Sequence, residues 1–154
     1  MMEQIVVYKE SLKEDVFEFT DKCFLEIGKA FEPDGRHSFY NDIEKEFDCF
    51  WCLLTDDKVA GTVGIRKEND TTAELKAMYL SQELRGKGYG YKLLDLAMTY
   101  SKEKGYKRVV LDSMSKYEAA LSLYEKYGFR RIDRYNYNQK ADVFMEYCFQ
   151  EIVK

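Results

Sequence analysis

Residues 84–90 read LRGKGYG, with glycine at positions 86, 88 and 90, Arg85 directly before the first glycine and Lys87 between the first two. Before them, the pattern of residues 73–80 predicts a strand, and after them residues 88–104 have the apolar periodicity of a helix. The first turn of a helix carries backbone N–H groups without an intrahelical partner, and glycines let an anion approach them closely. This order predicts an α/β protein with a site for a phosphorylated ligand. A tight turn with solvated cations is the alternative.

The loop lacks the spacing of two well-known nucleotide motifs. A P-loop requires GxxxxGK[ST], which is absent, and the dinucleotide pattern GxGxxG requires glycine where Tyr91 stands. The sequence therefore supports neither ATP held by a P-loop nor a dinucleotide held by a Rossmann fold.

The remaining segments alternate between strand and helix patterns. A capping box at 11–14 predicts a helix that begins with Ser11 as its N-cap. A turn at 55–58 joins two strands within 49–69, and glycines follow two of the expected helices, at Gly105 and Gly128. The expected order is β-α-α-β-β-β-α-β-α-β-β, which indicates a mixed sheet. The strands are expected at 4–8, 49–54, 59–67, 73–80, 107–114, 129–137 and 142–149, and the helices at 11–27, 38–47, 88–104 and 117–127.

Chain length, composition and net charge limit the classes of protein to which this chain can belong. A chain of 154 residues with 45% hydrophobic residues predicts a single domain over 1–154 with a real core. A net charge of −4 argues against nucleic acid as the main partner. The N-terminus lacks a signal pattern, and no apolar run approaches the ~20 residues that span a bilayer. We therefore expect a cytoplasmic protein without a membrane partner.

The cysteines do not predict a metal centre. Cys49 and Cys52 have the spacing of a CxxC motif, but they lie in an apolar run that predicts a strand. Residues three apart on a strand point to opposite faces, so the two thiols would not converge on one ion. The only histidine is His37, in a polar segment, where an ordinary loop residue is the simplest interpretation. We expect buried, reduced thiols and no metal.

The region from residue 73 to residue 149 resembles the GNAT superfamily, the general-control-related N-acetyltransferases. Arg85-x-x-Gly88-x-Gly90 fits the signature [QR]-x-x-G-x-[GA], and residues 120–129, ALSLYEKYGF, resemble a later helix of that superfamily. The resemblance extends weakly to residues before 48. It implies an α/β (α+β) fold with a mixed, mainly antiparallel sheet of about seven strands and about four helices. In that fold the fourth and fifth strands splay apart.

The resemblance implies acetyl-CoA as co-substrate. Its pantetheine arm would pair with the backbone of Met78, Tyr79 and Leu80, and the Met78 N–H would face the thioester carbonyl. Its diphosphate would bind at the glycine loop, on Arg85, Gly86, Lys87, Gly88, Tyr89, Gly90 and Tyr91.

The resemblance also implies two catalytic side chains. Tyr124 matches a tyrosine that acts as general acid toward the CoA thiolate, and Glu74 matches a general base of the histone-acetylating branch. The alternatives are a tyrosine that only packs on the sheet and a strand carboxylate bound to a nearby lysine or arginine. One position departs from the family: Tyr117 stands where many members carry a pantetheine-binding asparagine, so Ser113 or Ser115 would have to supply that contact.

The expected function is transfer of an acetyl group to a primary amine of a small molecule or peptide, and a non-catalytic acyl-CoA sensor is the alternative. The acceptor would contact residues 30–47 and 133–142. Arg36 and His37 suit an acceptor with a carboxylate, whereas the acidic residues Asp34, Asp42, Glu44 and Glu46 suit a cationic amine. A homodimer is a further expectation that the family carries.

Overall fold

A computed structural model describes residues 2–150. Its elements follow the predicted order β-α-α-β-β-β-α-β-α-β-β, with short 3₁₀ turns before α1, α2 and α3. The first half consists of β1 (Glu3–Val7), α1 (Lys13–Glu26), α2 (Ile43–Glu46), β2 (Cys49–Thr55), β3 (Lys58–Lys67) and β4 (Thr72–Leu80). The second half consists of α3 (Tyr89–Glu103), β5 (Arg108–Ser113), α4 (Glu118–Tyr127), β6 (Arg130–Ile132) and β7 (Val143–Cys148).

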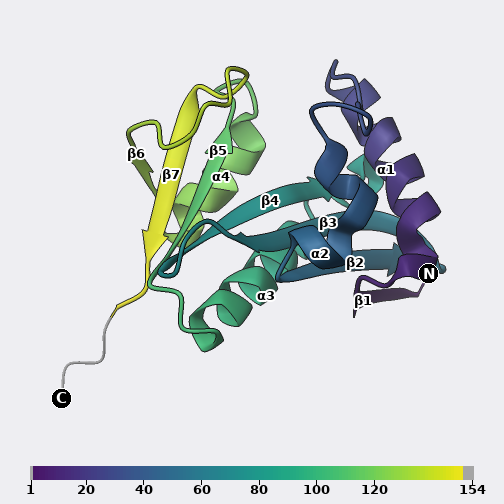
Figure 1. Cartoon of the computed structure of the whole chain (residues 1–154). Coiled ribbons are helices and arrows are strands. Elements are labelled where there is room, and N and C mark those ends of the chain that lie inside the picture. Colours follow the sequence, from purple (N-terminus) through teal and green to yellow (C-terminus); the bar gives the residue numbers. More distant parts are fainter. Residues whose placement is uncertain (1, 151–154) are drawn as a thin grey trace.

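The strands form one seven-stranded sheet in the order β1-β2-β3-β4-β5-β7-β6. Neighbours are antiparallel except β4 and β5, which run parallel and pair only from Thr72 to Glu74 against Arg108 to Val110. Beyond these pairs the two strands diverge, and Figure 1 shows β5, β6 and β7 turning away from β1–β4. We call this region, residues 76–80 of β4 and 111–113 of β5, the fork. The predicted sheet with splayed fourth and fifth strands is confirmed.

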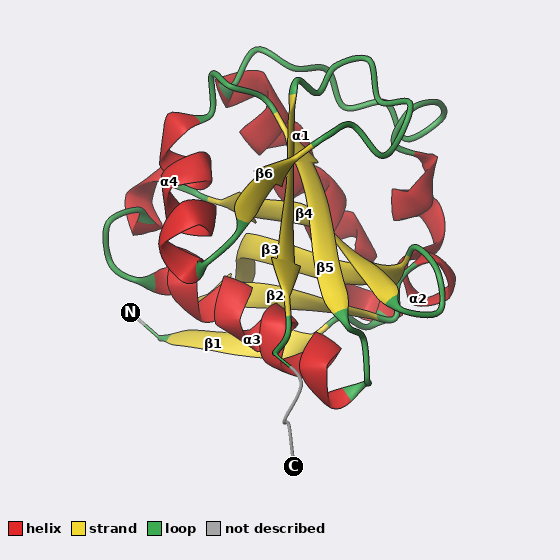
Figure 2. Ribbon diagram, turned by 90° about the vertical axis from the view of Figure 1, so that its left-hand side faces the viewer, coloured by secondary structure: helices red, strands yellow, loops and turns green. Residues whose placement is uncertain are grey.

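Helices cover both faces of the sheet, with α3 and α4 on one side and α2 on the other (Figure 2). One apolar cluster contains Trp51 and the buried face of α3, and the other contains Cys52 and the buried face of α1. Cys49 packs against the first cluster, so the two thiols of the CxxC motif lie on opposite faces as predicted. Both are free thiols; Cys52 is buried, whereas Cys49 is half-buried, so the expectation of buried thiols is wrong for Cys49.

Strand β4 contains an irregularity that the sequence analysis did not predict. Against β3, Thr62 pairs with Tyr79 and Gly64 with Lys76, so β4 carries an extra residue between these pairs. Ala77 within this bulge has a φ of 57°, and the Thr62 hydroxyl donates to its carbonyl at 2.6 Å. A bulge changes the direction of the strand beyond it, and this bulge lies at the fork.

Two sequence-based boundaries are wrong. Residues 10–12 form a 3₁₀ turn, and α1 begins at Lys13 without a side-chain cap, so the Ser11 capping box does not form. The strand expected over 129–137 ends at Ile132. Beyond it the Arg134 guanidinium donates to the carbonyls of Asn138 and Ala141, at 2.8 and 2.9 Å. The segment therefore bonds to itself as a loop instead of extending the sheet.

Candidate active site

The glycine loop leads directly into the first turn of α3. Gly86 and Gly88 have φ values of 77° and 87°, and Gly88 is the N-cap of the helix. The first helical bond of α3 runs from the Lys92 N–H to the Gly88 carbonyl, so the preceding N–H groups have no acceptor within the helix. A Cβ placed on Gly86 or Gly88 would meet no atom within 4 Å. The loop is therefore open on the side where an anion would approach these N–H groups.

Side chains hold this loop against the rest of the molecule. Leu84 is buried, the Arg85 guanidinium reaches the Leu80 carbonyl at 3.5 Å, and the Tyr89 hydroxyl donates to Glu3 at 2.8 Å. A Cβ on Gly90 would lie 3.3 Å from Leu123 of α4, so this glycine allows α3 and α4 to approach. The three glycines thus serve two purposes, backbone conformation at 86 and 88 and helix packing at 90.

Met78, Tyr79 and Leu80 lie in the part of β4 that has lost its β5 neighbour. They retain β3 as a partner, through Thr62 with Tyr79 and Gly61 with Leu80. On the side facing β5, the peptide groups of this segment have no strand partner. An extended ligand could pair with them as an additional strand would.

Tyr124 of α4 is buried to 7% exposure in the cluster that lies between α3, α4 and the sheet. Burial, with a further contribution from the charge of Asp112, raises its pKa. Met78 and Leu80 of β4 pack against the same cluster. The structure therefore brings Tyr124, expected as the acid, to the strand segment that was expected to hold the thioester.

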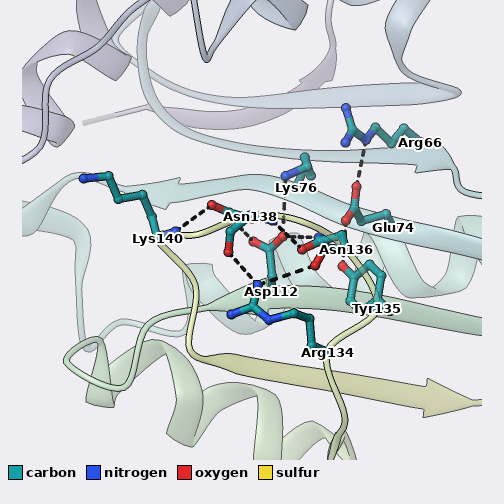
Figure 3. A network of polar contacts seen from close by, with 9 residues as sticks. All are labelled: Arg66, Glu74, Lys76, Asp112, Arg134, Tyr135, Asn136, Asn138 and Lys140. Atoms are coloured by element: carbon teal, nitrogen blue, oxygen red, sulfur yellow. Dashed lines mark hydrogen bonds and ion pairs between the residues drawn. The ribbon is translucent and has the colours of Figure 1, made fainter.

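Glu74 lies on β4 where β4 and β5 last pair, and it is 1% exposed. One carboxylate oxygen accepts from Arg66 Nε at 2.8 Å and the other from the Tyr135 hydroxyl at 2.6 Å (Figure 3). Tyr135 in turn has its pKa raised by burial and by Glu74. The alternative weighed from the sequence, a strand carboxylate bound to a nearby arginine, describes these contacts.

Asp112 on β5 is a second carboxylate at the fork, and the sequence analysis did not identify it. It accepts from Asn136 at 2.6 Å and Asn138 at 3.3 Å, and Lys76 of β4 lies 3.9 Å away (Figure 3). Together with the contacts of Arg134 and Tyr135, these bonds fix the 133–142 loop above both strands of the fork. The alternating polar residues of 134–138 were the available clue, but they were interpreted as a strand.

His37 is buried and stabilises the loop to which it belongs. It is 6% exposed, its Nδ1 accepts from the Glu32 N–H at 3.0 Å, and its ring lies 5.1 Å from that of Phe24. Burial, followed by the charges of Lys29 and Arg36, lowers its pKa to about 4. His37 is therefore neutral at pH 7 and holds the loop that carries Arg36, which itself is exposed. The expected polar loop residue is thus a buried one.

A model of the acetyltransferase (GNAT) family matches residues 13–129 of this chain. The chain belongs to the GNAT family. Human N-acetyltransferase 8B is 32% identical to it over 101 residues, which are 59% of this chain and 44% of the human protein. The uncharacterized Escherichia coli N-acetyltransferase YjgM is 36% identical over 88 residues, 54% of this chain and 52% of that protein. The chain thus spans about half or less of the curated relatives it matches.

Solved structures share the GNAT fold along the whole length of the chain. A GNAT-family acetyltransferase from Staphylococcus aureus Mu50 superposes with a TM-score of 0.89 at 23% identity, covering 97% of this chain and 100% of that one. The PaiA N-acetyltransferase of Thermoplasma acidophilum, solved with coenzyme A, gives a TM-score of 0.74 at 20% identity, covering 97% and 100%. These likenesses extend the assignment of the fold beyond the matched family region.

Tyr117 is the position where this GNAT protein departs from the expected asparagine. It is the N-cap of α4, and burial raises the pKa of its phenol. Of the two serines considered as substitutes, Ser115 is engaged elsewhere, because its N–H and hydroxyl donate to Asp142 at 2.7 and 2.6 Å. Ser113 ends β5 and pairs with Val143, so it remains the candidate nearer to the fork.

No helix within residues 2–150 is long and apolar enough to cross a membrane. No group of three or more His, Cys, Asp or Glu side chains in that range is arranged to hold a metal ion.

Proposed function

We propose that this protein transfers the acetyl group of acetyl-CoA to a primary amine. The observation that carries the proposal is the open glycine loop at the N-terminus of α3, next to a β4 segment without a strand partner and the buried Tyr124. Family membership and the relatives' names as N-acetyltransferases support the same activity. The coenzyme A in the Thermoplasma structure supports the choice of co-substrate.

The two ends of acetyl-CoA would meet different parts of the site. The diphosphate would accept from the backbone N–H groups of residues 86–91, where the helix dipole also favours negative charge. Lys87 adds a cation to the same loop. The pantetheine arm would pair with the free side of residues 78–80, with the Met78 N–H toward the thioester carbonyl. A donor at this place stabilises the oxyanion that forms during acyl transfer.

The reaction then needs two proton movements. The amine must lose a proton before attack, because lysine-like amines have a pKa near 10.4. Its nitrogen forms a bond to the carbonyl carbon, the carbonyl oxygen becomes an oxyanion, and collapse breaks the C–S bond. Tyr124 gives its proton to the departing thiolate, and its raised pKa keeps it protonated for that step.

For the base we favour a water path over Glu74. Glu74 is 1% exposed and both oxygens of its carboxylate accept from protein donors, so the carboxylate is not open to an incoming ammonium group. Glu74 would instead act as a positioning residue, which holds Tyr135 and, through it, the 133–142 loop over the fork.

Two substitutions separate the base from the positioning residue. If Glu74 only holds Tyr135, we expect Glu74→Gln and Tyr135→Phe to lower kcat/KM by similar factors, below about 10-fold, with little further loss in the double variant. A general base would instead make Glu74→Gln slower by roughly 100-fold or more, with Tyr135→Phe near the parent. The measurement is steady-state kinetics of CoA thiol release, with circular dichroism as the control for folding.

The proposed activity is tested by calorimetric titration with acetyl-CoA, followed by thiol release over a panel of amines. We expect saturable binding and release that depends on the amine. Binding without release on any amine would favour the acyl-CoA sensor instead. An absence of binding would refute the glycine loop as the diphosphate site, and the proposed function with it.

A further inference from the structure

Lys76 and Asp112 face each other at the base of the fork. The last pair between β4 and β5 joins Glu74 to Val110. Because the two strands run parallel, the same register places Lys76 opposite Asp112 two residues further on. Their side chains still meet, with the Lys76 Nζ atom 3.9 Å from a carboxylate oxygen of Asp112 (Figure 3). Both side chains are largely buried, at 19% and 12% exposure, so the pair closes the fork where the strands separate.

The reacting end of acetyl-CoA would lie next to this pair. In the proposed binding mode, the diphosphate binds at residues 86–91 and the pantetheine arm pairs with residues 78–80. The acyl end therefore points away from the glycine loop, toward the residues that precede Met78. Two residues of chain span at most about 7 Å, so the Cα atoms of Lys76 and Met78 are no further apart than that. An acceptor must bring its amino group to the same place.

Lys76 and Asp112 lie on the face of the sheet opposite Tyr124. Side chains alternate between the two faces along a strand. Leu75 and Leu111 belong to the apolar cluster that contains Tyr124. Lys76 and Asp112, each one residue further along its strand, therefore point to the other face. An amine held there would approach the thioester from one side of the sheet, while Tyr124 protonates the thiolate from the other side.

The Asp112 carboxylate has room for a further donor. Its oxygens accept from the side-chain amides of Asn136 and Asn138, at 2.6 and 3.3 Å, and these neutral donors use two of about four acceptor positions. The Lys76 ammonium, at 3.9 Å, is beyond the distance of a hydrogen bond, which is about 2.7–3.2 Å. Glu74 differs, because a guanidinium donates to it at 2.8 Å. Asp112 is thus a carboxylate whose cationic neighbour does not hydrogen-bond to it.

Lys76 has a second contact that would stabilise it away from Asp112. Its ammonium lies 5.8 Å from the centroid of the Phe39 ring, which is within the range of a cation–π interaction. A ligand ammonium that reached hydrogen-bond distance of the carboxylate would form a stronger contact than Lys76 does, because hydrogen bonds between charged groups are short and strong. The Lys76 side chain can therefore be displaced from Asp112.

We propose that Asp112 binds the ammonium group of the acceptor and that Lys76 occupies this carboxylate until the acceptor displaces it. The inference rests on the proposed acetyl transfer, and it names the acceptor as an alkylamine that binds as a cation. Because a carboxylate stabilises the charged form of the amine, Asp112 contributes to the KM for the amine rather than to kcat.

The proton transfers of the reaction balance with Asp112 ionised throughout. The bound ammonium first gives one proton to water. Its nitrogen then forms the bond to the carbonyl carbon, the C–S bond breaks, and Tyr124 gives its proton to the thiolate. The nitrogen loses a second proton, which restores the phenol. Asp112 holds the acceptor in place and takes no proton itself.

The first test compares amines that differ in charge. n-Butylamine and cyclohexylamine are cations at pH 7, whereas aniline, which has the same ring size as cyclohexylamine, is neutral. With thiol release as the readout, we expect kcat/KM to be at least about 10-fold higher for an alkylamine than for aniline. Equal or better use of aniline would overturn the inference. Release with no amine at all, despite binding of acetyl-CoA, would instead refute the transferase activity itself.

Asp112→Asn connects that preference to the carboxylate. We expect the variant to raise KM for the alkylamine about 10-fold or more, with kcat and the KM for acetyl-CoA near the parent values. Asp70→Asn is the matched control, because it removes a carboxylate from an exposed ion pair with Lys67 in the turn before β4, and it should behave like the parent. A loss confined to kcat would make Asp112 the proton acceptor and would contradict the assignment.

Lys76→Met should have the opposite effect. Removal of the displaceable ammonium is expected to lower KM for the alkylamine about 3- to 5-fold, as for the loss of a weak ion pair, and Lys67→Met is its control. Asn138→Ala removes a loop contact from Asp112 but keeps the carboxylate, so it should raise KM less than Asp112→Asn does. An unchanged or higher KM in Lys76→Met, or equal increases in Asn138→Ala and Asp112→Asn, would show that these contacts only support the fold. Circular dichroism of each variant is the control for folding.

Discussion

Gly88→Val is expected to weaken acetyl-CoA binding on the order of 100-fold or more, which corresponds to about 2.7 kcal/mol of binding free energy. Gly88 has a φ of 87°, and the space beside it is empty, so the substitution creates no clash with the protein. The added side chain would occupy the space through which the diphosphate reaches the N–H groups of the first turn of α3. Isothermal titration calorimetry with acetyl-CoA measures the effect directly.

Strain alone could weaken binding by distorting the helix, and Gly105→Val controls for it. Gly105 follows the other end of α3, has a φ of 92°, and likewise has no atom within 4 Å of an added Cβ. Each substitution places a β-branched residue in the left-handed region, at a cost of about 1–2 kcal/mol. We expect similar losses of thermal stability in the two variants, with parent-like affinity only in Gly105→Val. Equal affinities in the two variants would contradict the diphosphate assignment.

The parts of this fold that the sequence predicts are those with local causes. Helix α3 and strand β4 show their own periodicity, and glycines mark the helix ends at Gly105 and Gly128. The error at 129–137 has the opposite origin. Alternation in DRYNY resembles a strand, but Arg134 and the asparagines bond to loop carbonyls and to Asp112, and those partners come from tertiary structure.

The candidate site likewise contains residues that sequence motifs identify and residues that only the fold brings together. The glycine loop and Tyr124 belong to contiguous motifs, so the sequence identifies them before any fold is known. The hydrogen-bond partners of Glu74 do not belong to such motifs. Arg66 is its directly opposite residue across β3 and β4, and a correct strand register would have revealed the pair. Tyr135 is 61 residues away, and its contact depends on how the last loop folds back over the fork.

The distribution of charge in the fold explains why sequence motifs alone do not identify the acceptor. The chain as a whole is acidic, with a net charge of −4, yet burial, followed by the positive charges of Arg36 and Lys76, lowers the pKa of Lys29. The sequence supplies the total, whereas the fold decides which charges face the reacting atoms. Local potential, rather than net charge, governs which ligand a site prefers.

Tyr124→Phe is expected to lower kcat on the order of 10–1000-fold while the affinity for acetyl-CoA stays within a few-fold of the parent. The substitution removes one hydroxyl from a ring whose packing against Phe129, at 5.8 Å between centroids, is retained. Loss of a general acid costs roughly 100–10,000-fold when departure of the leaving group limits the rate, and less when another step shares control. Stopped-flow or steady-state assays of thiol release, together with calorimetry, separate the two effects.

Tyr127→Phe on the same helix is the matched control. Tyr127 lies one turn further along α4 and donates its hydroxyl to Asp95 at 2.8 Å, so its loss removes a hydrogen bond worth about 1 kcal/mol without touching the fork. We expect reduced thermal stability and parent-like turnover.

The pH dependence of the rate tests the assignment of Tyr124 in a second way. Because burial and the Asp112 charge raise the pKa of Tyr124, the phenol stays protonated as the pH rises from about 7 to 9. Over that range the rate should increase as the acceptor amine loses its proton. A fall in rate that disappears in Tyr124→Phe would show that the phenol ionises there, and it would contradict the environment that makes this residue a proton donor.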